Sequence, residues 1–319
     1  MSGRVHDPDL PEGFVSRPAT DADLDAVVDL IGRTDRALGV EPDPVRDFLK
    51  WIWHVPSTDL DRDTRVIHDP AGLACFSQGL WNAEEGGPLQ SLVAVHPDRR
   101  GLGLGTWGAA RNEALAADRG SEGVRARIPH RDDTAARLLS SRGYLRVRSA
   151  YTMRRDLLAD EDLGSTPAGV TIRTFETGRD ERVLHEVNET SFAGHWGFRP
   201  LPYETFAVEM YDAQDWDPHL ALLAEVDDDV VGHAVSFASD DGGHVGILGV
   251  IPSARGRGIA KALLRRSFST LADRGHRVVR LGVDAQNPTG AVALYEGVGM
   301  TVSHAYDMYD LGTPDALRV

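Results

Sequence analysis

Cysteine is nearly absent from this sequence, and its absence excludes two classes of protein. The one cysteine, Cys75, rules out an intramolecular disulfide framework and a cysteine-based zinc finger. No apolar run approaches the roughly 18 residues that a helix needs to cross a bilayer. The first residues also lack the apolar core of a signal peptide. These absences predict a cytoplasmic protein without a membrane partner.

Positive charge is scarce as well. The chain has 34 Lys and Arg against 49 Asp and Glu, which gives a formal net charge of −15 at pH 7. Nonspecific binding to nucleic acid depends on basic residues that neutralise phosphates, so this balance argues against a nucleic-acid partner. The same negative charge would tolerate or attract a cationic small molecule.

The sequence contains an internal repeat. Glycine-rich segments at residues 93–105 and 248–260 lie 155 positions apart, and Gly143 and Gly299 lie 156 positions apart. Motifs that recur at separations of 155 and 156 residues indicate two copies of a unit of about 150 residues.

The length agrees with two domains. At roughly 100–200 residues per domain, 319 residues allow two units that each bury a core. We predict an N-terminal copy at residues 1–158 and a C-terminal copy at residues 170–319. Residues 159–169 are acidic and then rich in glycine, serine and proline, which is typical of an exposed linker. Since one lobe can pack on the other in place of dimerisation, we expect a monomer with pseudo-twofold tandem lobes.

Hydrophobic periodicity predicts a mixed α/β fold, with helices covering a sheet that is antiparallel early and parallel in the middle. In the second copy the expected strands are residues 170–173, 219–226, 230–238, 244–251, 278–283 and 303–311. Helices are expected at residues 181–192, from residue 259 and at residues 290–296. The helix from residue 259 has an apolar face formed by Ile259, Leu263, Leu264, Phe268 and Leu271. The N-terminal copy follows suit, with a central helix at residues 106–119.

The glycine-rich segment at residues 255–260 stands between an expected strand and an expected helix. The first N–H groups of a helix lack intrahelical partners, and the helix dipole adds positive charge there, so this turn suits an anion. Glycine lets a phosphate approach the backbone closely. The segment matches neither the G-x-G-x-x-G nor the G-x-x-x-x-G-K-[ST] pattern. Taken alone, it could also be a tight turn into a helix.

Residues 255–260 resemble the R/Q-x-x-G-x-G/A acyl-CoA signature of the GNAT-type N-acetyltransferases, and residues 100–105 resemble it equally well. Residues 287–300 are similar to that family's N-x-x-A-x-x-L-Y-x-x-x-G-F segment, with one extra residue before the tyrosine and Met300 in place of Phe. The resemblance implies two tandem GNAT folds and acetyl-CoA, bound where two parallel central strands splay apart. Among tandem members, the arrangement most resembles mycothiol synthase and related two-lobed acetyltransferases.

The resemblance also implies which residues contact the coenzyme. In the second copy these are the backbone of Leu248 and Val250 together with Arg255, Gly256, Arg257, Gly258, Ile259, Ala260, Lys261 and Asn287. The matching positions of the first copy are Val93, Val95, Arg100, Gly101, Gly103, Leu104, Gly105 and Thr106, and whether they bind the coenzyme stays open at this point.

Acetyl transfer to an amine needs a proton acceptor for the amine and a proton donor for the departing thiolate. Tyr295 occupies the family's general-acid position, whereas the first copy has Leu139 there, which cannot donate a proton. The resemblance places the base at His244, early in the strand before the glycine segment. His244 is equally well explained as a solvated strand-end histidine, and Glu225 and Asp284 are alternative carboxylates on neighbouring strands.

The acceptor side is expected in the aromatic-rich residues 192–200, where Phe192, His195 and Trp196 would line a pocket or belong to the core. No H-E-x-x-H motif or similar set of ligands predicts a metal site.

The sequence thus predicts an acetyl-CoA-dependent N-acetyltransferase in which the second copy transfers acetyl directly to the primary amine of a small molecule. A mycothiol-synthase-like role and acetylation of an amine antibiotic are both compatible with it. The alternatives are a non-catalytic acyl-CoA-binding or sensing protein, and a protein N-acetyltransferase. The last would need an open groove, whereas the insert at residues 35–60 favours a covered site.

Overall fold

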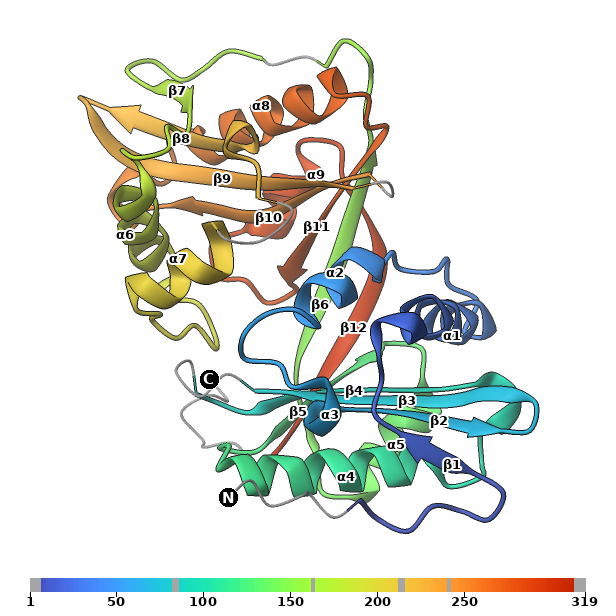
Figure 1. Cartoon of the computed structure of the whole chain (residues 1–319). Helices are drawn as coiled ribbons and strands as arrows, with labels where there is room; N and C mark the ends of the chain where they lie inside the picture. The colour runs from blue at the N-terminus through green and yellow to red at the C-terminus, as the bar shows by residue number, and fades with distance from the viewer. Residues whose placement is uncertain (1–6, 82–85, 162–163, 212–215, 240–241, 313–319) are drawn as a thin grey trace. The chain divides into compact units, whose positions relative to one another are not determined.

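The computed structural model describes residues 7–81, 86–161, 164–211, 216–239 and 242–312 (Figure 1). The chain divides into two compact units. Unit 1 comprises Met1–Ala150 and His304–Val319, and unit 2 comprises Tyr151–Ser303. Each unit is a mixed sheet flanked by helices, as the sequence predicts.

Unit 1 contains a sheet with the strand order β1-β2-β3-β4-β5-β12. Its β4 and β5 are parallel, and the other neighbours in this order are antiparallel. Side chains of α1 and α2 pack with strand residues such as Val66 and Phe76 in one cluster, and α4 lies over a separate cluster that includes Val93. The strands are β1 (Val15–Arg17), β2 (Thr64–Asp69), β3 (Gly72–Leu80), β4 (Leu89–Val95), β5 (Val124–Pro129) and the part of β12 (Thr301–Leu311) from residue 304 on; the helices are α1 (Leu24–Ala37), α2 (Arg46–Ile52), α3 (Leu60–Asp63), α4 (Leu104–Arg119) and α5 (Asp133–Ser141).

Unit 2 repeats this plan, with the strand order β6-β11-β10-β9-β8-β7. Its β10 and β11 are parallel, while β7, β8, β9 and β10 are joined by antiparallel pairing. The strands are the end of β6 (Leu145–Asp156), β7 (Thr171–Thr174), β8 (Ala221–Val226), β9 (Asp229–Ser239), β10 (Gly242–Val250) and β11 (Val278–Asp284); the helices are α6 (Glu181–Phe192), α7 (Tyr203–Tyr211), α8 (Ile259–Asp273) and α9 (Ala291–Glu296). Short 3₁₀ turns lie at Asp21–Asp23, Pro97–Arg99, Pro218–Leu220 and Pro252–Ala254.

The sheet of unit 2 separates two layers of helices (Figure 1). Leu222 packs with residues of α8, whereas its neighbour Leu223 packs with residues of α6 and α7. Successive side chains of a strand point to opposite faces, so α8 covers one face and α6 and α7 cover the other. Helix α9 packs in one cluster with α8 and therefore lies on the face of α8.

Most of the predicted elements of unit 2 are confirmed. Helix α6 has the predicted bounds, and the five apolar residues predicted on one face of α8 are all buried. The predicted parallel pairing in the middle of the sheet is present as well. Helix α7 is an element that the sequence analysis did not predict.

The units do not end where the predicted lobes end. Residues Tyr306 to Leu311 of β12 pair with β5, so the last strand completes unit 1, although it follows unit 2 in the chain. In return, the N–H of Leu157, just after β6, donates to the carbonyl of Arg277 in unit 2. Of the predicted linker, residues 159–161 and 164–169 form neither helix nor strand, and residues 162–163 lie outside the described residues. The last strand belongs to unit 1 because it pairs with β5, which is far away in the sequence. Hydrophobic periodicity along the chain does not reveal such long-range pairing.

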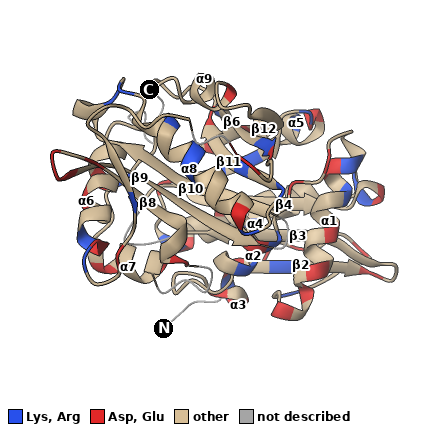
Figure 2. Cartoon of the chain, turned by 90° about the horizontal axis from the view of Figure 1, so that it is seen from above, with Lys and Arg blue, Asp and Glu red and all other residues tan. Residues whose placement is uncertain are grey.

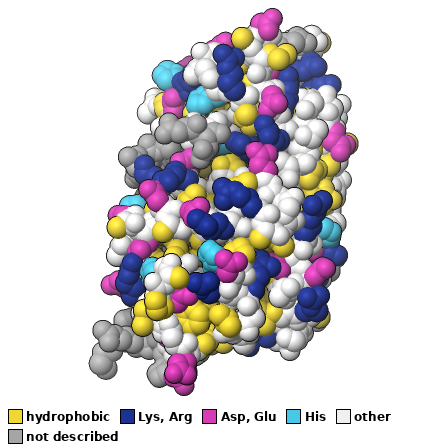
Figure 3. Space-filling model, turned by 90° about the vertical axis from the view of Figure 1, so that its right-hand side faces the viewer, with side chains coloured by type: hydrophobic (Ala, Val, Ile, Leu, Met, Phe, Trp, Pro, Cys, Tyr) yellow, Lys and Arg dark blue, Asp and Glu magenta, His cyan; other side chains and the backbone are white. Residues whose placement is uncertain are grey.

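Charged residues of both signs occur in both units (Figure 2). Acidic and basic segments both occur on α1 and on α6, and on the face drawn in Figure 3 the basic side chains lie between acidic and hydrophobic ones. The net charge of −15 is therefore spread over mixed surfaces.

The joint between β5 and β12 contains a buried ion pair that can be tested by mutation. Arg125 donates to both carboxylate oxygens of Asp310 at 2.8 Å each, and Asp310 is 1 % exposed. Replacing Asp310→Asn should lower the free energy of unfolding of unit 1 by about 3 to 5 kcal/mol, because the guanidinium loses its buried carboxylate. Urea unfolding followed by hydrogen exchange of the unit 1 strands measures this loss.

The matched control is Asp29→Asn. Asp29 forms an exposed i,i+4 pair with Arg33 on α1, and its loss should cost less than about 1 kcal/mol. Equal effects of the two substitutions would contradict a stabilising role for the buried pair.

Candidate functional site

The parallel strands β10 and β11 part from each other within unit 2. Their paired residues are Gly243 with Val279 and His244 with Arg280, and beyond these β10 continues to Val250 and β11 to Asp284. A β-bulge between Val245 and Ile247 shifts the register of β10 against β9 at the same place. Backbone pairing between the two strands therefore ends at His244 and Arg280, and the gap in pairing beyond these residues is called the opening. Backbone groups of β10 that a neighbouring strand would pair face this opening.

The alternation of β10 shows which backbone groups face this opening. The N–H of Ile251 donates to the carbonyl of Val231 on β9. Because backbone groups of successive strand residues point to opposite edges, those of Leu248 and Val250 point to the edge on the side of β11. These are the two residues whose backbone the sequence analysis assigned to the coenzyme.

The glycine segment lies between β10 and α8. Gly256 and Gly258 have φ of +77° and +80°, a conformation that residues with a side chain rarely adopt. The first intrahelical bond of α8 runs from the N–H of Ala262 to the carbonyl of Gly258. The N–H groups of the three residues before Ala262 therefore have no intrahelical acceptor, and together with the helix dipole they form a site that suits a phosphate group.

Arg255 holds this segment in place. Its Nε donates to the carbonyl of Val250 at 3.1 Å, and its Nη2 donates to the carbonyl of Ser191 at 2.8 Å. The side chain thus ties the loop to the end of β10 and to α6, which is a positioning role that the sequence analysis did not foresee. Arg257 is exposed and Lys261 is partly buried, and both add positive charge beside the helix terminus.

Tyr295 lies on α9, with 8 % of its surface exposed. It packs with Phe268 of α8 and Val279 of β11. Burial raises the pKa of its hydroxyl to about 12, because the phenolate would lose its hydration. The hydroxyl therefore stays protonated at neutral pH, and its raised pKa makes it a weaker proton donor than an exposed tyrosine.

Asn287 shapes the turn between β11 and α9. Its N–H donates to the carbonyl of Asp284, and its Oδ1 accepts from the N–H of Thr289 at 2.8 Å. Gly290, with φ of +76°, then begins α9. Asn287 thereby helps to place the helix that carries Tyr295, and its contact with a coenzyme stays a prediction.

The three residues considered as proton acceptors lie in different places. His244 is exposed on β10, where β10 and β11 are still paired. Asp284 is partly buried at the end of β11, where the two strands are apart. Glu225 is on β8, which β9 separates from β10, and its Oε1 accepts from Arg173 at 2.7 Å. The structure brings Glu225 into an ion pair between β7 and β8 rather than to the opening.

The predicted acceptor-side residues Phe192, His195 and Trp196 are partly buried at the end of α6 and in the loop after it. The rings of Phe192 and His195 meet edge to face, with centroids 4.9 Å apart. Burial lowers the pKa of His195, the charge of Arg255 lowers it further, and the charge of Asp284 raises it. The ring of Phe192 in turn lies 6.5 Å from that of His233, which places the loop that carries His195 against β9.

Unit 1 has the same backbone frame with different side chains. The ladder between β4 and β5 ends at Ser91 and Ala126, and Gly101 and Gly103 have φ of +78° and +86°. The N–H of Trp107 makes the first intrahelical bond of α4, to Gly103, so Leu104, Gly105 and Thr106 take the positions of Ile259, Ala260 and Lys261.

The side chains around the unit 1 loop favour a phosphate less. Arg100 pairs with Asp132 at 2.9 Å, and Asp132 also caps α5 by accepting from the N–H of Ala135. Leu102, 49 % exposed, takes the position of Arg257. Leu139 is buried at the position that corresponds to Tyr295.

Comparison with known proteins identifies the family. The model of the acetyltransferase (GNAT) family matches residues 184–300, which lie within unit 2. The chain is 33 % identical over 295 residues to the mycothiol acetyltransferase of Thermobispora bispora, covering 88 % of this chain and 94 % of that protein. The chain belongs to the GNAT acetyltransferase family.

Solved structures agree with this assignment. The GCN5-related N-acetyltransferase from Sphaerobacter thermophilus has a TM-score of 0.82 and 32 % identity, covering 96 % of this chain and 100 % of that one. A tandem GNAT protein from the clavulanic acid biosynthesis pathway has a TM-score of 0.70 at 16 % identity, covering 94 % and 99 % of the two chains, and supports the fold. The predicted resemblance to two-lobed GNAT enzymes is confirmed, and this GNAT protein is an acetyltransferase.

Two polar residues beside the opening of this GNAT acetyltransferase escaped the sequence analysis. A Cβ at Gly249 of β10 would lie 2.5 Å from Cε1 of His233 and 3.0 Å from Oγ of Ser191. Both ring nitrogens of His233 and the Ser191 hydroxyl are enclosed and lack a hydrogen-bond partner among the described residues. The signal was a histidine inside the otherwise apolar run of β9, where a core residue is expected.

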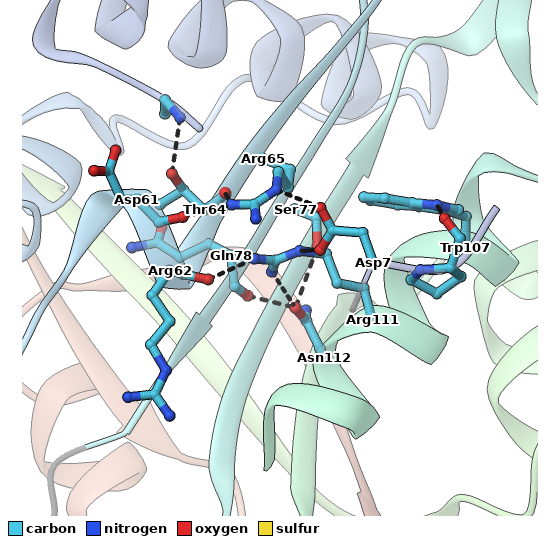
Figure 4. A network of polar contacts seen from close by, with 12 residues as sticks. Asp7, Asp61, Arg62, Thr64, Arg65, Ser77, Gln78, Trp107, Arg111 and Asn112 are labelled. Atoms are coloured by element: carbon cyan, nitrogen blue, oxygen red, sulfur yellow. Dashed lines mark hydrogen bonds and ion pairs between the residues drawn. The ribbon is translucent and has the colours of Figure 1, made fainter. Parts of the chain in front are cut away.

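Unit 1 contains a separate buried polar network (Figure 4). Asp7 accepts from Arg65 at 2.6 Å and from Arg111 at 3.0 Å, and Trp107 donates to the carbonyl of Pro8. Arg111 is fully buried, and burial lowers its pKa to about 10, so it remains charged at neutral pH. These contacts fasten the segment around Asp7 to α4 and β2, which is a structural role.

Across the described ranges, His, Cys, Asp and Glu side chains nowhere gather in a group of three or more that could hold a metal ion. Within the same ranges, none of the helices has the length and apolar character that spanning a membrane requires.

The burial of His233 predicts a dependence of stability on pH. The folded protein holds the pKa of His233 at about 4, whereas the unfolded chain has its ordinary value of 6.5. Between these values the unfolded chain binds a proton that the folded chain does not, so stability falls as the pH falls from 6.5 to 4. The contribution is about 3 kcal/mol. In His233→Asn, which cannot titrate, the free energy of unfolding of unit 2 should fall less over this range by that amount.

Urea unfolding of unit 2 at several pH values, followed by hydrogen exchange in β9, measures the difference. His219→Asn is the control, because His219 is exposed and should keep the wild-type dependence. An unchanged dependence in His233→Asn would show that His233 is not held neutral.

Proposed function

We propose that this acetyltransferase moves an acetyl group from acetyl-CoA to the primary amine of a small molecule by direct, sequential transfer, with the chemistry in unit 2. One observation carries the proposal. Unit 2 combines the strand opening, the glycine segment at the start of α8 and a buried, protonated Tyr295, whereas unit 1 has Leu139 at the tyrosine position.

The residues of unit 2 fit acetyl-CoA. The N–H groups at the start of α8, with Arg257 and Lys261 beside them, suit its pyrophosphate. The backbone groups of Leu248 and the N–H of Val250, which face the opening, suit the amides of its pantetheine arm. The carbonyl of Val250 already accepts from Arg255. When bound, acetyl-CoA supplies an acetyl group activated as a thioester.

The chain's own residues then accept a proton from the amine and donate one to the departing sulfur. An alkyl amine with a pKa of about 10.4 is neutral only about once in 10³ molecules at pH 7, so a residue of the site must accept its proton. As the C–S bond breaks, the Tyr295 hydroxyl donates its proton to the departing sulfur. N–H groups on the open edge of β10 would stabilise the negative charge that develops on the carbonyl oxygen.

A small-molecule acceptor is supported by the relatives named mycothiol acetyltransferase, which cover most of the chain. Between the two roles considered above, these relatives favour one related to mycothiol synthesis over antibiotic acetylation. The net charge of −15 also favours a cationic amine. A cytoplasmic monomer with two tandem lobes, of which the first is catalytically degenerate, completes the proposal.

The assignment of the acid is tested by Tyr295→Phe. Loss of a positioned general acid should lower kcat by about 10² to 10⁴-fold and leave the affinity for acetyl-CoA nearly unchanged. Release of thiol from acetyl-CoA with a panel of primary amines measures kcat. The control Tyr211→Phe removes a partly buried hydroxyl that donates to the carbonyl of Glu181 on α6, and it should keep kcat. Unchanged turnover in Tyr295→Phe would favour the acyl-CoA sensor.

The assignment of the active copy is tested by a matched pair of glycine substitutions. Gly258→Val should weaken acetyl-CoA binding at least tenfold, because valine resists the left-handed backbone that turns the N–H groups toward the phosphates. Gly103→Val makes the same change in unit 1 and should leave turnover largely intact. Binding by calorimetry and melting temperatures separate a local effect from unfolding. Loss of turnover in Gly103→Val alone would place the chemistry in unit 1.

A further inference from the structure

The loop after α6 holds the side chain of His195 in one orientation. The N–H of His195 donates to the carbonyl of Phe192 at 2.8 Å, and the carbonyl of His195 accepts from the N–H of Phe198 at 3.1 Å. The edge of one ring meets the face of the other in the pair Phe192 and His195, with an angle of 83° between their planes. Backbone and ring are therefore both held, so the direction of the ring nitrogens is set by the fold.

This held imidazole has an unused nitrogen. The Nε2 of His195 is enclosed, yet it has no hydrogen-bond partner among the described residues. An enclosed polar atom left without a partner costs about 1 to 3 kcal/mol. A ligand or a proton that reaches this atom would supply the missing partner.

The charges around His195 suit a group that takes up a proton and then releases it. Burial and the guanidinium of Arg255 both favour the neutral ring, and Arg255 is held in place by its two backbone hydrogen bonds. Asp284, at the end of β11, favours the protonated ring. Phe192, which meets the His195 ring, is apolar and adds no charge. His233, whose ring lies 6.5 Å from that of Phe192, is held neutral by burial and adds none either.

We propose that Nε2 of His195 is the proton acceptor for the amine that is acetylated, an inference that rests on the proposed function. The alternative, His244, is exposed at the end of the opening where β10 and β11 are still paired. The ring of His195 instead meets that of Phe192, and the ring of Phe192 lies 6.5 Å from that of His233. His233 lies against Gly249, in the part of β10 beyond its last pair with β11.

The protons and bonds balance in this scheme. His195 takes one proton from R–NH₃⁺, and the neutral nitrogen forms a C–N bond to the thioester carbonyl carbon. The C–S bond breaks, Tyr295 gives its proton to the sulfur, and the second amine proton restores the Tyr295 hydroxyl. His195 then releases its proton to solvent. The sum is R–NH₃⁺ and acetyl-CoA giving the amide, CoA–SH and one proton.

The first test is kinetic. In His195→Gln the side chain can still form a hydrogen bond but cannot take a proton, so kcat should fall by about 10² to 10⁴-fold. The affinity for acetyl-CoA should stay within about twofold. In His195→Ala, added imidazole should restore part of kcat, because a free base can occupy the space. His219→Ala removes an exposed histidine of the same unit and should neither lose activity nor respond to imidazole.

The second test needs no turnover. Histidine titration by NMR should give His195 a pKa below 6.5 in the free protein. Asp284→Asn removes the charge that favours the protonated ring, so it should move that pKa further down. A His195 pKa that Asp284→Asn leaves unmoved would overturn the assignment, because the imidazole would then lie away from the end of β11.

The outcomes distinguish the two proposals. A wild-type protein that releases no thiol with any amine refutes the proposed function, while the titration remains readable. An active wild type whose His195→Gln variant keeps its kcat and pH profile refutes the role of His195 alone. Loss of acetyl-CoA affinity with kcat retained also refutes it, and so does imidazole rescue in His244→Ala but not in His195→Ala.

Discussion

The separation of β10 from β11 is the constraint on which the site of unit 2 depends. Parallel pairing stops at His244 and Arg280, and a bulge in β10 follows directly. Because the strands part, the backbone groups of Leu248 and Val250 face an opening instead of a neighbouring strand. The same strand leads into the glycine segment, so the open edge of β10 and the N-terminus of α8 are parts of one continuous binding surface.

The two units combine one backbone frame with different side chains. Both units have a parted pair of parallel strands and two glycines with positive φ before the central helix. They differ in side chains: Arg100 is neutralised by Asp132, and a leucine stands where unit 2 has Tyr295. The match to the family model lies within unit 2.

Much of the fold could be predicted from local sequence patterns. The bounds of α6 and the buried face of α8 follow from helical periodicity, and the glycine segment follows from backbone conformations that only glycine adopts readily. The exchange of β6 and β12 was not predictable, because strand partners are chosen over long distances. Neither was the enclosed group formed by Ser191 and His233, whose residues meet only when α6 packs on the sheet. The hydrogen bonds from Arg255 to the carbonyls of Val250 and Ser191 were not predictable either, because they also form only in the folded chain.

A crystal structure of the chain with bound acetyl-CoA tests the central claim most directly. The account predicts pyrophosphate density against the N–H groups of Ile259, Ala260 and Lys261, with the thioester sulfur within hydrogen-bond distance of the Tyr295 hydroxyl. Coenzyme found only at the loop of unit 1, or bound in unit 2 with its sulfur far from Tyr295, would contradict the account.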